Sequence, residues 1–353
     1  MTTVRTVIAI AALKHWPLFQ MDVHNAFLNG DLFEEASRQW ILKLTQALLT
    51  SGFKQSRHDY SLFTKTTNGA FVLILVYVDD LLVTSNDLAE IQLAKDALHK
   101  NFKLKDLGEL RYFLGVEFAR SSEGIIMSQR KYTLEMISEA SLPGSKPKET
   151  PMEQHLKLTS AEFDELIKTK SSDELLCLSQ FLQAPKRSHY EATLHVVKYV
   201  KNQPGLGLLM SSTSAKEIVA YCDSDWASCP MSRKSVTGFC IKLGASLISW
   251  KAKQRTISRS SAEAEYRSMA RTVAELICLK GLLMGLQVNV KMPMELYCDN
   301  KAALQIATNH MYHERTEYIE NDFHFIREQI QEGLIRTTYL SSQEQPADIL
   351  TKA

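Results

Sequence analysis

Two adjacent aspartates stand at the end of the longest apolar run in the chain. The run covers residues 70–78, Asp79 and Asp80 follow directly, and residues 81–84 turn apolar again. An exposed turn places acids there for solubility alone, but β-rich runs on both sides of an acidic pair are typical of a tight hairpin. Neighbouring carboxylates repel each other unless cations neutralise them. Together with Asp22, which closes an upstream strand, the pattern favours a metal site.

A second set of acids is spread along the C-terminal part of the chain, at Asp223, Glu265, Asp299 and Asp348. Each acid alone has an ordinary explanation, because strand ends carry turn acids and a helical glutamate usually faces solvent. Their order is more informative, since it places one acid on a strand, one on a helix, one at a strand end and one at a helix start. Asp225 shares a strand face with Asp223, so spacing alone leaves the choice between them open.

The elements that must position the first set follow from the periodicity of apolar residues. We expect mixed helices and strands, then a polar segment with three prolines that is typical of a linker. The expected elements are a helix at 4–14, a strand at 20–23, a helix at 40–51, strands at 71–78 and 81–84, a helix at 88–101, a strand–turn–strand unit at 112–132, the linker at 141–176 and a helix at 189–201.

Downstream of residue 216 the pattern changes to three short strands and a long helix. This β-β-β-α-β-α order predicts an α/β layer arrangement in which helices cover a sheet. The expected elements are strands at 217–222, 236–243 and 246–251, a helix at 261–285, a strand at 294–298, helices at 301–308 and 322–332, a strand at 334–340 and a helix at 346–352.

The composition is that of an ordinary globular chain. Its 353 residues are 45% hydrophobic and 23% charged, with a net charge of +1, so no overall basic field attracts nucleic acid. A local cluster at Lys251, Lys253, Arg255 and Arg259 suits phosphate contact or simple solvation equally. The six cysteines have no zinc-site spacing. The longest apolar run is too short for a bilayer, so we expect a soluble, intracellular protein without a membrane partner.

The wording around both acid sets resembles one known family. The motifs are FQMDVHNAFLNGDL, SRHDYSLF, LVYVDDLLVTSND, LGELRYFLGVEF, DSDWA, RKSVTGFC, SLISWKAK, SSAEAEY, CDNKAA and ADILTKA. Together they resemble the reverse transcriptase–RNase H region of a copia-type LTR retrotransposon polyprotein, over nearly the whole chain. The resemblance implies an α+β reverse-transcriptase palm remnant at 1–118, a thumb or connection remnant at 119–216 and an α/β RNase H-like domain at 217–353, the last with a mixed five-stranded sheet and helices.

The resemblance assigns roles to the first acid set. Asp22, Asp79 and Asp80 would hold two Mg²⁺ ions, with Mn²⁺ as an alternative, and these ions would support in-line joining of deoxynucleotides to a primer–template. Tyr77 and Phe27 would contact the substrate, with Phe27 against the sugar 2′ position.

The second set would form a ribonuclease H centre. By the resemblance, Asp223, Glu265, Asp299 and Asp348 hold two Mg²⁺ ions about 3.5–4 Å apart. The substrate would be the RNA strand of an RNA–DNA hybrid, which its 2′-hydroxyls distinguish from DNA.

Three further assignments follow from the match to the family motifs. The match favours Asp223 over Asp225 and Glu265 over Glu263. It also makes His324 a substrate-binding candidate for product release or proton handling, although a histidine satisfied within its helix explains that residue equally well.

Three places depart from the family pattern. Stretches that the family carries are missing around residues 35–40 and 173–180, and Glu317-Tyr318 replace a lysine–histidine pair. The chain starts just upstream of the first palm motif, so we also expect the fingers region to be absent. We therefore expect polymerase activity to be lost and ribonuclease H activity to survive more readily. The alternatives are an inactive transposon relic with residual nucleic-acid binding and, less favoured, an acidic two-metal phosphatase.

Overall fold

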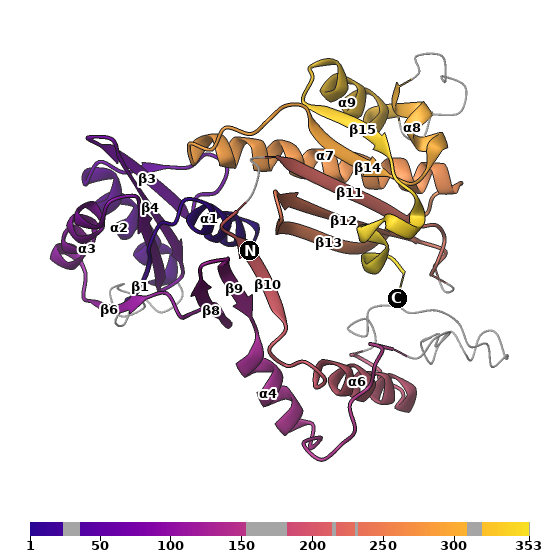
Figure 1. Ribbon diagram of the computed structural model, residues 1–353, viewed down its shortest axis with the longest axis horizontal. Helices are drawn as coiled ribbons and strands as arrows, with labels where there is room; N and C mark the ends of the chain where they lie inside the picture. The colour runs from indigo at the N-terminus through magenta and orange to yellow at the C-terminus, as the bar shows by residue number, and fades with distance from the viewer. Residues whose placement is uncertain (24–35, 153–181, 214–216, 230–231, 309–319, 353) are drawn as a thin grey trace.

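The computed structural model describes residues 1–23, 36–152, 182–213, 217–229, 232–308 and 320–352. Within these ranges the chain forms three sheets with helices packed around them (Figure 1). No helix in the described part is long and apolar enough to cross a membrane.

The first sheet carries the predicted hairpin at its centre. Its strand order is β2-β3-β4-β5-β1-β6, and β4 and β5 pair antiparallel. Every β4 residue except Tyr77 is buried, which explains the unbroken apolar run. Helices α2 and α3 share an apolar cluster with this sheet. The bounds are β1 Leu18–Val23, β2 Lys54–Gln55, β3 Leu62–Thr67, β4 Ala70–Tyr77, β5 Asp80–Ser85, β6 Leu104–Glu109, α2 Ala36–Thr50 and α3 Leu88–Asn101.

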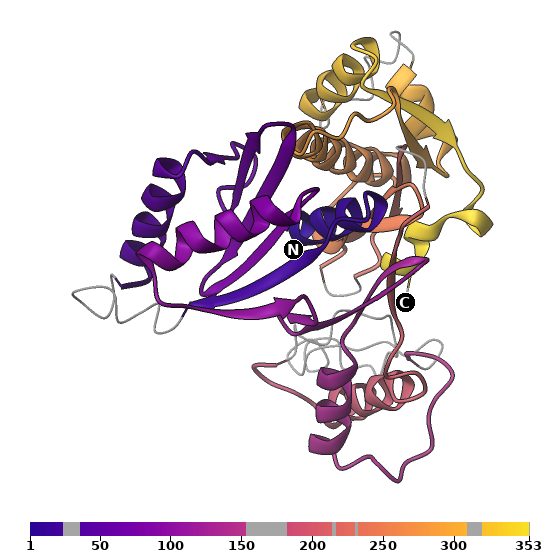
Figure 2. The ribbon, with the colours of Figure 1, turned by 60° about the vertical axis from the view of Figure 1, so that its left-hand side comes forward.

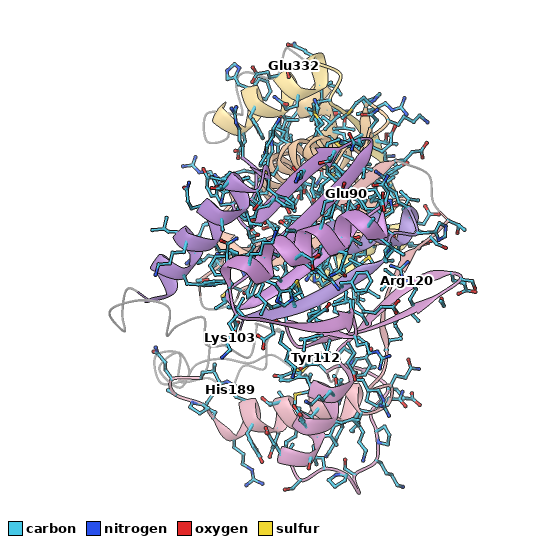
Figure 3. The ribbon with its side chains drawn as sticks, turned by 90° about the vertical axis from the view of Figure 1, so that its left-hand side faces the viewer. Glu90, Lys103, Tyr112, Arg120, His189 and Glu332 are labelled. Carbon is cyan, nitrogen blue, oxygen red and sulfur yellow. The ribbon has the colours of Figure 1, made fainter. Side chains whose placement is uncertain are left out.

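The second sheet joins segments that are far apart in sequence. Its order is β10-β9-β8-β7. Strand β9 pairs with β10 although residues 129–206 separate them in the sequence. The expected second strand of the 112–132 unit is shorter than predicted, because helix α4 begins at Arg130. Figure 3 labels Tyr112 on β7, Arg120 on β8 and His189 on α6, below Glu90 of α3. The bounds are β7 Tyr112–Phe113, β8 Val116–Ser121, β9 Gly124–Ser128, β10 Gly207–Ser211, α4 Arg130–Glu139 and α6 Arg187–Val200.

The third sheet has the order β13-β12-β11-β14-β15. Strands β13, β12 and β11 pair antiparallel, whereas β11, β14 and β15 pair parallel, which confirms the predicted mixed five-stranded sheet. The expected helix at 346–352 is instead the short 3-10 turn η4. The bounds are β11 Ile218–Asp225, β12 Ser235–Leu243, β13 Ser246–Thr256, β14 Met294–Cys298, β15 Ile335–Tyr339, α7 Ser261–Gly285, α8 Lys301–Thr308, α9 Glu320–Gln331 and η4 Pro346–Leu350.

The N-terminal helix α1 (Thr2–Leu13) lies between the first and third sheets (Figures 1 and 2). The Arg5 guanidinium sits 3.4 Å from the ring centroid of Trp250 on β13. One apolar cluster contains eight residues spread over α1 and the segment after it together with Leu73 of β4 and Ile241 of β12. The first and third sheets therefore share a core through α1.

Candidate carboxylate centres

The first acid set meets at one end of the first sheet. Asp22 of β1 pairs directly with Asp80, the first residue of β5. The Val23 amide donates a hydrogen bond of 3.0 Å to the carbonyl of Asp79, which ties β1 to the hairpin turn. The fold thus brings the three predicted acids, which are far apart in sequence, to one sheet end.

The environment of Asp80 disfavours its negative charge. Burial raises the pKa of Asp80 above its ordinary value, and the nearby charges of Asp79 and Asp22 raise it further. Gln20 Nε2 donates a 3.2 Å hydrogen bond to Asp80 Oδ1 and partly opposes this effect. A bound cation would relieve the repulsion among the three carboxylates, so their arrangement fits a metal site.

Sequence reasoning missed the residue that anchors the aspartate turn. Trp40 is fully buried at the start of α2, and its indole Nε1 donates a 2.8 Å hydrogen bond to the carbonyl of Val78. Val78 has a φ of +56°, a left-handed conformation that a β-branched residue rarely adopts. The Trp40 ring also meets Phe102 edge-on at 5.0 Å. The hydrogen bond from Trp40 therefore stabilises the strained turn that carries Asp79 and Asp80.

The two predicted substrate contacts of this centre differ in what can be said of them. Tyr77 is 47% exposed beside the turn, so it is open to a ligand. Phe27 lies outside the described residues.

The second acid set also assembles, from four separate elements. Asp223 lies on β11, Asp299 directly follows the neighbouring parallel strand β14, and Asp348 belongs to η4. One carboxylate oxygen from each of these three lies within 4.8 Å of the others. Glu265, from the first turns of α7, accepts a 3.0 Å hydrogen bond from the Ser224 amide and is only 5% exposed.

Burial makes this centre costly to ionise. Burial raises the pKa of Glu265 to about 10, with further increases from Cys298, Asp223 and Asp299. It also raises the pKa of Asp223 to about 6, against the lowering effects of Thr351 and Lys352. Two buried acids with raised pKa values, facing further carboxylates, need a compensating positive charge.

The donor set fits divalent cations. Asp348 Oδ1 is a buried atom with no hydrogen-bond partner in the described chain, although Oδ2 of the same residue pairs with Lys352 Nζ at 2.8 Å. Ser342 Oγ donates to Asp299 Oδ2 at 2.6 Å and leaves the other oxygen available. Carboxylate oxygens of this kind are the ligands that Mg²⁺ and Mn²⁺ prefer.

The structure separates the acids that spacing left ambiguous. Glu263 faces away from the centre, because it pairs with Arg267 at 2.8 Å and accepts the Arg259 amide at 2.8 Å. Asp225 is half-buried two residues beyond Asp223 and belongs to neither candidate metal group in the described part of the chain. His324 is exposed on α9, with its ring 5.6 Å from Phe323.

Several supporting residues gave no signal in the sequence. Ser268 Oγ, buried on α7, donates to the carbonyl of Asp223 at 2.9 Å and to that of Gly238 at 3.1 Å. Thr351 Oγ1 donates to Asp223 Oδ2. A β-carbon at Gly238 would approach Thr351 Cγ2 to 2.8 Å, so this glycine lets the C-terminal segment close over β12. Such partners arise from contacts between distant segments, which local spacing does not encode.

Comparisons with known proteins find relatives along nearly the whole chain. The family model for reverse transcriptase (RNA-dependent DNA polymerase) matches residues 33–154. The retrovirus-related Pol polyprotein from transposon RE2 of Arabidopsis thaliana is 34% identical over 400 residues, covering 99% of this chain and 28% of that protein. The counterpart from transposon TNT 1-94 of Nicotiana tabacum is 30% identical over 411 residues, covering 100% of this chain and 31% of that protein. The chain thus spans less than a third of the length of these relatives.

The antiparallel sheet with its aspartate hairpin and the mixed five-stranded sheet are those expected of a reverse transcriptase region followed by an RNase H-like domain. The chain belongs to the Pol polyproteins of copia-type retrotransposons, as predicted. The aligned lengths of 400 and 411 positions exceed the 353 residues of the chain, so both alignments contain gaps on the side of this chain. A solved RNase H1 recovered from compost aligns over 38% of this chain and 93% of its own length, at 16% identity and a TM-score of 0.31.

Proposed function

We propose that the C-terminal centre cleaves the RNA strand of RNA–DNA hybrids with Mg²⁺, and that residues 217–353 are the nuclease unit. The observation that supports it best is the convergence of Asp223, Asp299 and Asp348 from three separate elements, with the buried Asp348 Oδ1 left unpaired. A structural acid normally satisfies its buried oxygens within the protein. An unpaired buried oxygen on an acid that lies close to two other acids is instead suited to binding a cation.

The chain's own residues would place and hold the charges at this centre. Bound Mg²⁺ ions would supply charge stabilisation and an activated water for phosphodiester hydrolysis. Asp223 on β11 and Asp299 directly after the adjacent parallel strand β14 lie side by side at one end of the sheet. Glu265 is fixed by the Ser224 amide, and the Lys352 ammonium stays near Asp348. These positions need no rearrangement before the reaction, which favours catalysis.

A basic groove beside the centre supports a nucleic-acid substrate. Lys251, Lys253 and Arg271 line a pocket of about 240 Å³ between β13 and α7. Ser268 also lines this pocket, and its hydroxyl bonds the Asp223 carbonyl, so groove and centre are neighbours. Lysine and arginine in such a groove give sequence-independent contact with phosphates.

For the first centre we propose that it descends from a polymerase active site but no longer catalyses templated DNA synthesis. Its three acids still converge, but by the resemblance a stretch that the family carries around residues 35–40 is missing. Polymerisation needs surfaces that clamp the template and the triphosphate in addition to the metal-binding acids. An inactive relic that only binds nucleic acid is the competing proposal for the whole chain.

The test is Mg²⁺-dependent cleavage of the RNA strand in a labelled RNA–DNA hybrid, with double-stranded DNA and RNA as substrate controls. We expect cleavage by the wild type, and loss of at least about a hundredfold in Asp299→Asn, because a ligand of the cation is removed. Glu263→Gln is the matched control on α7, since Glu263 faces away from the centre, and it should retain cleavage. Absence of cleavage by a folded wild type would leave the relic as the better description.

A further inference from the structure

A thiol lies beside two acids of the C-terminal centre, and we propose that it creates a second mode of metal binding there. In this mode Cys298, Glu265 and Asp299 bind one thiophilic divalent cation, of which Zn²⁺ is the biological example. One ligand atom from each residue lies within 4.8 Å of the other two. The metal binding rests on this geometry alone, and only its effect on cleavage rests on the nuclease function proposed above.

The distances are close to those of a formed site. Cys298 Sγ lies 3.9 Å from Glu265 Oε2, and Cys298 is fully buried at the end of β14. With Zn–S bonds near 2.3 Å and Zn–O bonds near 2.0–2.2 Å, ligand atoms of a tetrahedral zinc site are about 3.5 Å apart. The two atoms thus need to move only a few tenths of an ångström to share an ion, and water can take the fourth position.

Each of the three ligand residues already accepts a hydrogen bond from a neighbouring group. The Asn300 amide points at Cys298 Sγ at 3.4 Å, the Ser224 amide donates to Glu265 Oε1 at 3.0 Å, and Ser342 Oγ donates to Asp299 Oδ2 at 2.6 Å. Donors of this kind orient metal ligands and stabilise their negative charge. The Cys298 proton would leave to solvent as the metal–sulfur bond forms, so the site exchanges one proton for the cation.

The ligand chemistry separates this mode from the all-oxygen one. Mg²⁺ demands octahedral oxygen coordination, whereas thiolate ligands select Zn²⁺ and similar ions. Glu265 and Asp299 belong to both modes, so a cation on Cys298 withdraws them from the Asp223–Asp348 side. Zn²⁺ should therefore compete with Mg²⁺ and hold the centre in an inactive arrangement.

The experiment uses Cd²⁺ as the probe, because a cadmium–thiolate bond absorbs in the ultraviolet. The full chain carries Cys278→Ser, which removes the exposed cysteine among those in the described part of the chain. We expect a saturable band with one equivalent of Cd²⁺, lost in Cys298→Ser, with Cd²⁺ affinity at least about tenfold weaker in Glu265→Gln. A band that survives in folded Cys298→Ser, or is indifferent to Glu265→Gln, would overturn the proposal.

Cadmium NMR of the Cys278→Ser protein gives a reading that does not depend on how Cys298→Ser folds. A shift typical of mixed sulfur and oxygen ligands supports the site, and a shift typical of oxygen ligands alone refutes it. Neither measurement uses hybrid cleavage, so failure of the nuclease proposal and failure of this one are distinguishable. If cleavage occurs, Zn²⁺ should inhibit the wild type more strongly than Cys298→Ser.

Discussion

Replacing Glu265 with glutamine should change how the stability of the metal-free protein depends on pH. Burial raises the pKa of Glu265 to about 10 in the folded chain, against 4.5 for an ordinary glutamate. A raised folded-state pKa means that the folded protein keeps a proton that the unfolded chain releases. This contribution to stability is fully present below pH 4.5 and is lost progressively as the pH rises towards 10.

The size of the effect follows from the same shift. Each pH unit between the two pKa values costs about 1.4 kcal/mol for one group. Raising the pH from 6 to 8 should therefore lower the free energy of unfolding of the wild type by up to about 3 kcal/mol through Glu265. Glutamine has no proton to release, so Glu265→Gln should lack this component while keeping nearly the same volume.

Urea unfolding in a metal chelator, followed by tryptophan fluorescence at pH 6 and pH 8, measures the difference. Glu263→Gln is the matched control, because Glu263 lies on the same helix and is paired with Arg267. Adding Mg²⁺ at pH 8 should recover stability in the wild type more than in Glu265→Gln, since a bound cation favours the ionised carboxylate. Equal pH dependence of stability in the wild type and in Glu265→Gln would refute the claim that the pKa of Glu265 is raised in the metal-free folded protein.

Two further predictions concern one contact inside the first sheet's unit and one between that unit and α7. Trp40→Phe leaves the Val78 carbonyl without its indole donor, so the free energy of unfolding should fall by about 1–3 kcal/mol in urea titrations; no change would mean that the turn does not depend on this bond. Gly281→Ala places a β-carbon against the His58 imidazole, where the hairpin loop of the first sheet meets α7, and should cost about 1–3 kcal/mol by thermal unfolding. The double variant His58→Ala, Gly281→Ala should recover part of that loss, and purely additive losses would argue against the contact.

Local patterns predicted the elements best where a capping residue marks a helix start. Helices α3 and α7 begin where predicted, and in each the preceding side chain, Asp87 or Ser260, accepts a hydrogen bond from a first-turn amide. Strands β6 and β10 were missed. β6 lies at the edge of its sheet with mostly exposed side chains, and β10 forms by pairing with a segment about 80 residues away. Pairing partners at such distances leave no periodic trace in either strand.

The candidate sites likewise contain residues that the sequence predicts and residues that only the fold brings together. The acids could be predicted because their types, order and motif wording are visible in the sequence. The Trp40–Val78 bond and the position of Cys298 beside Glu265 could not, because each joins residues that meet only after the chain has folded. The choice of Glu265 over Glu263 rested on family wording, and its physical reason, the pairing of Glu263 with Arg267, appears only in three dimensions.

Helix α1, between the first and third sheets, also limits which parts of this chain can change or be lost during evolution. Because α1 lies against β13 and shares one apolar cluster with both sheets, the C-terminal half does not bury its own surface completely without the N-terminal half. The loss of polymerase chemistry that we propose would therefore not release the N-terminal sequence from constraint. The N-terminal half can persist as an intramolecular scaffold, and the substitutions tolerated there should be those that keep α1 seated, whatever becomes of the aspartate turn.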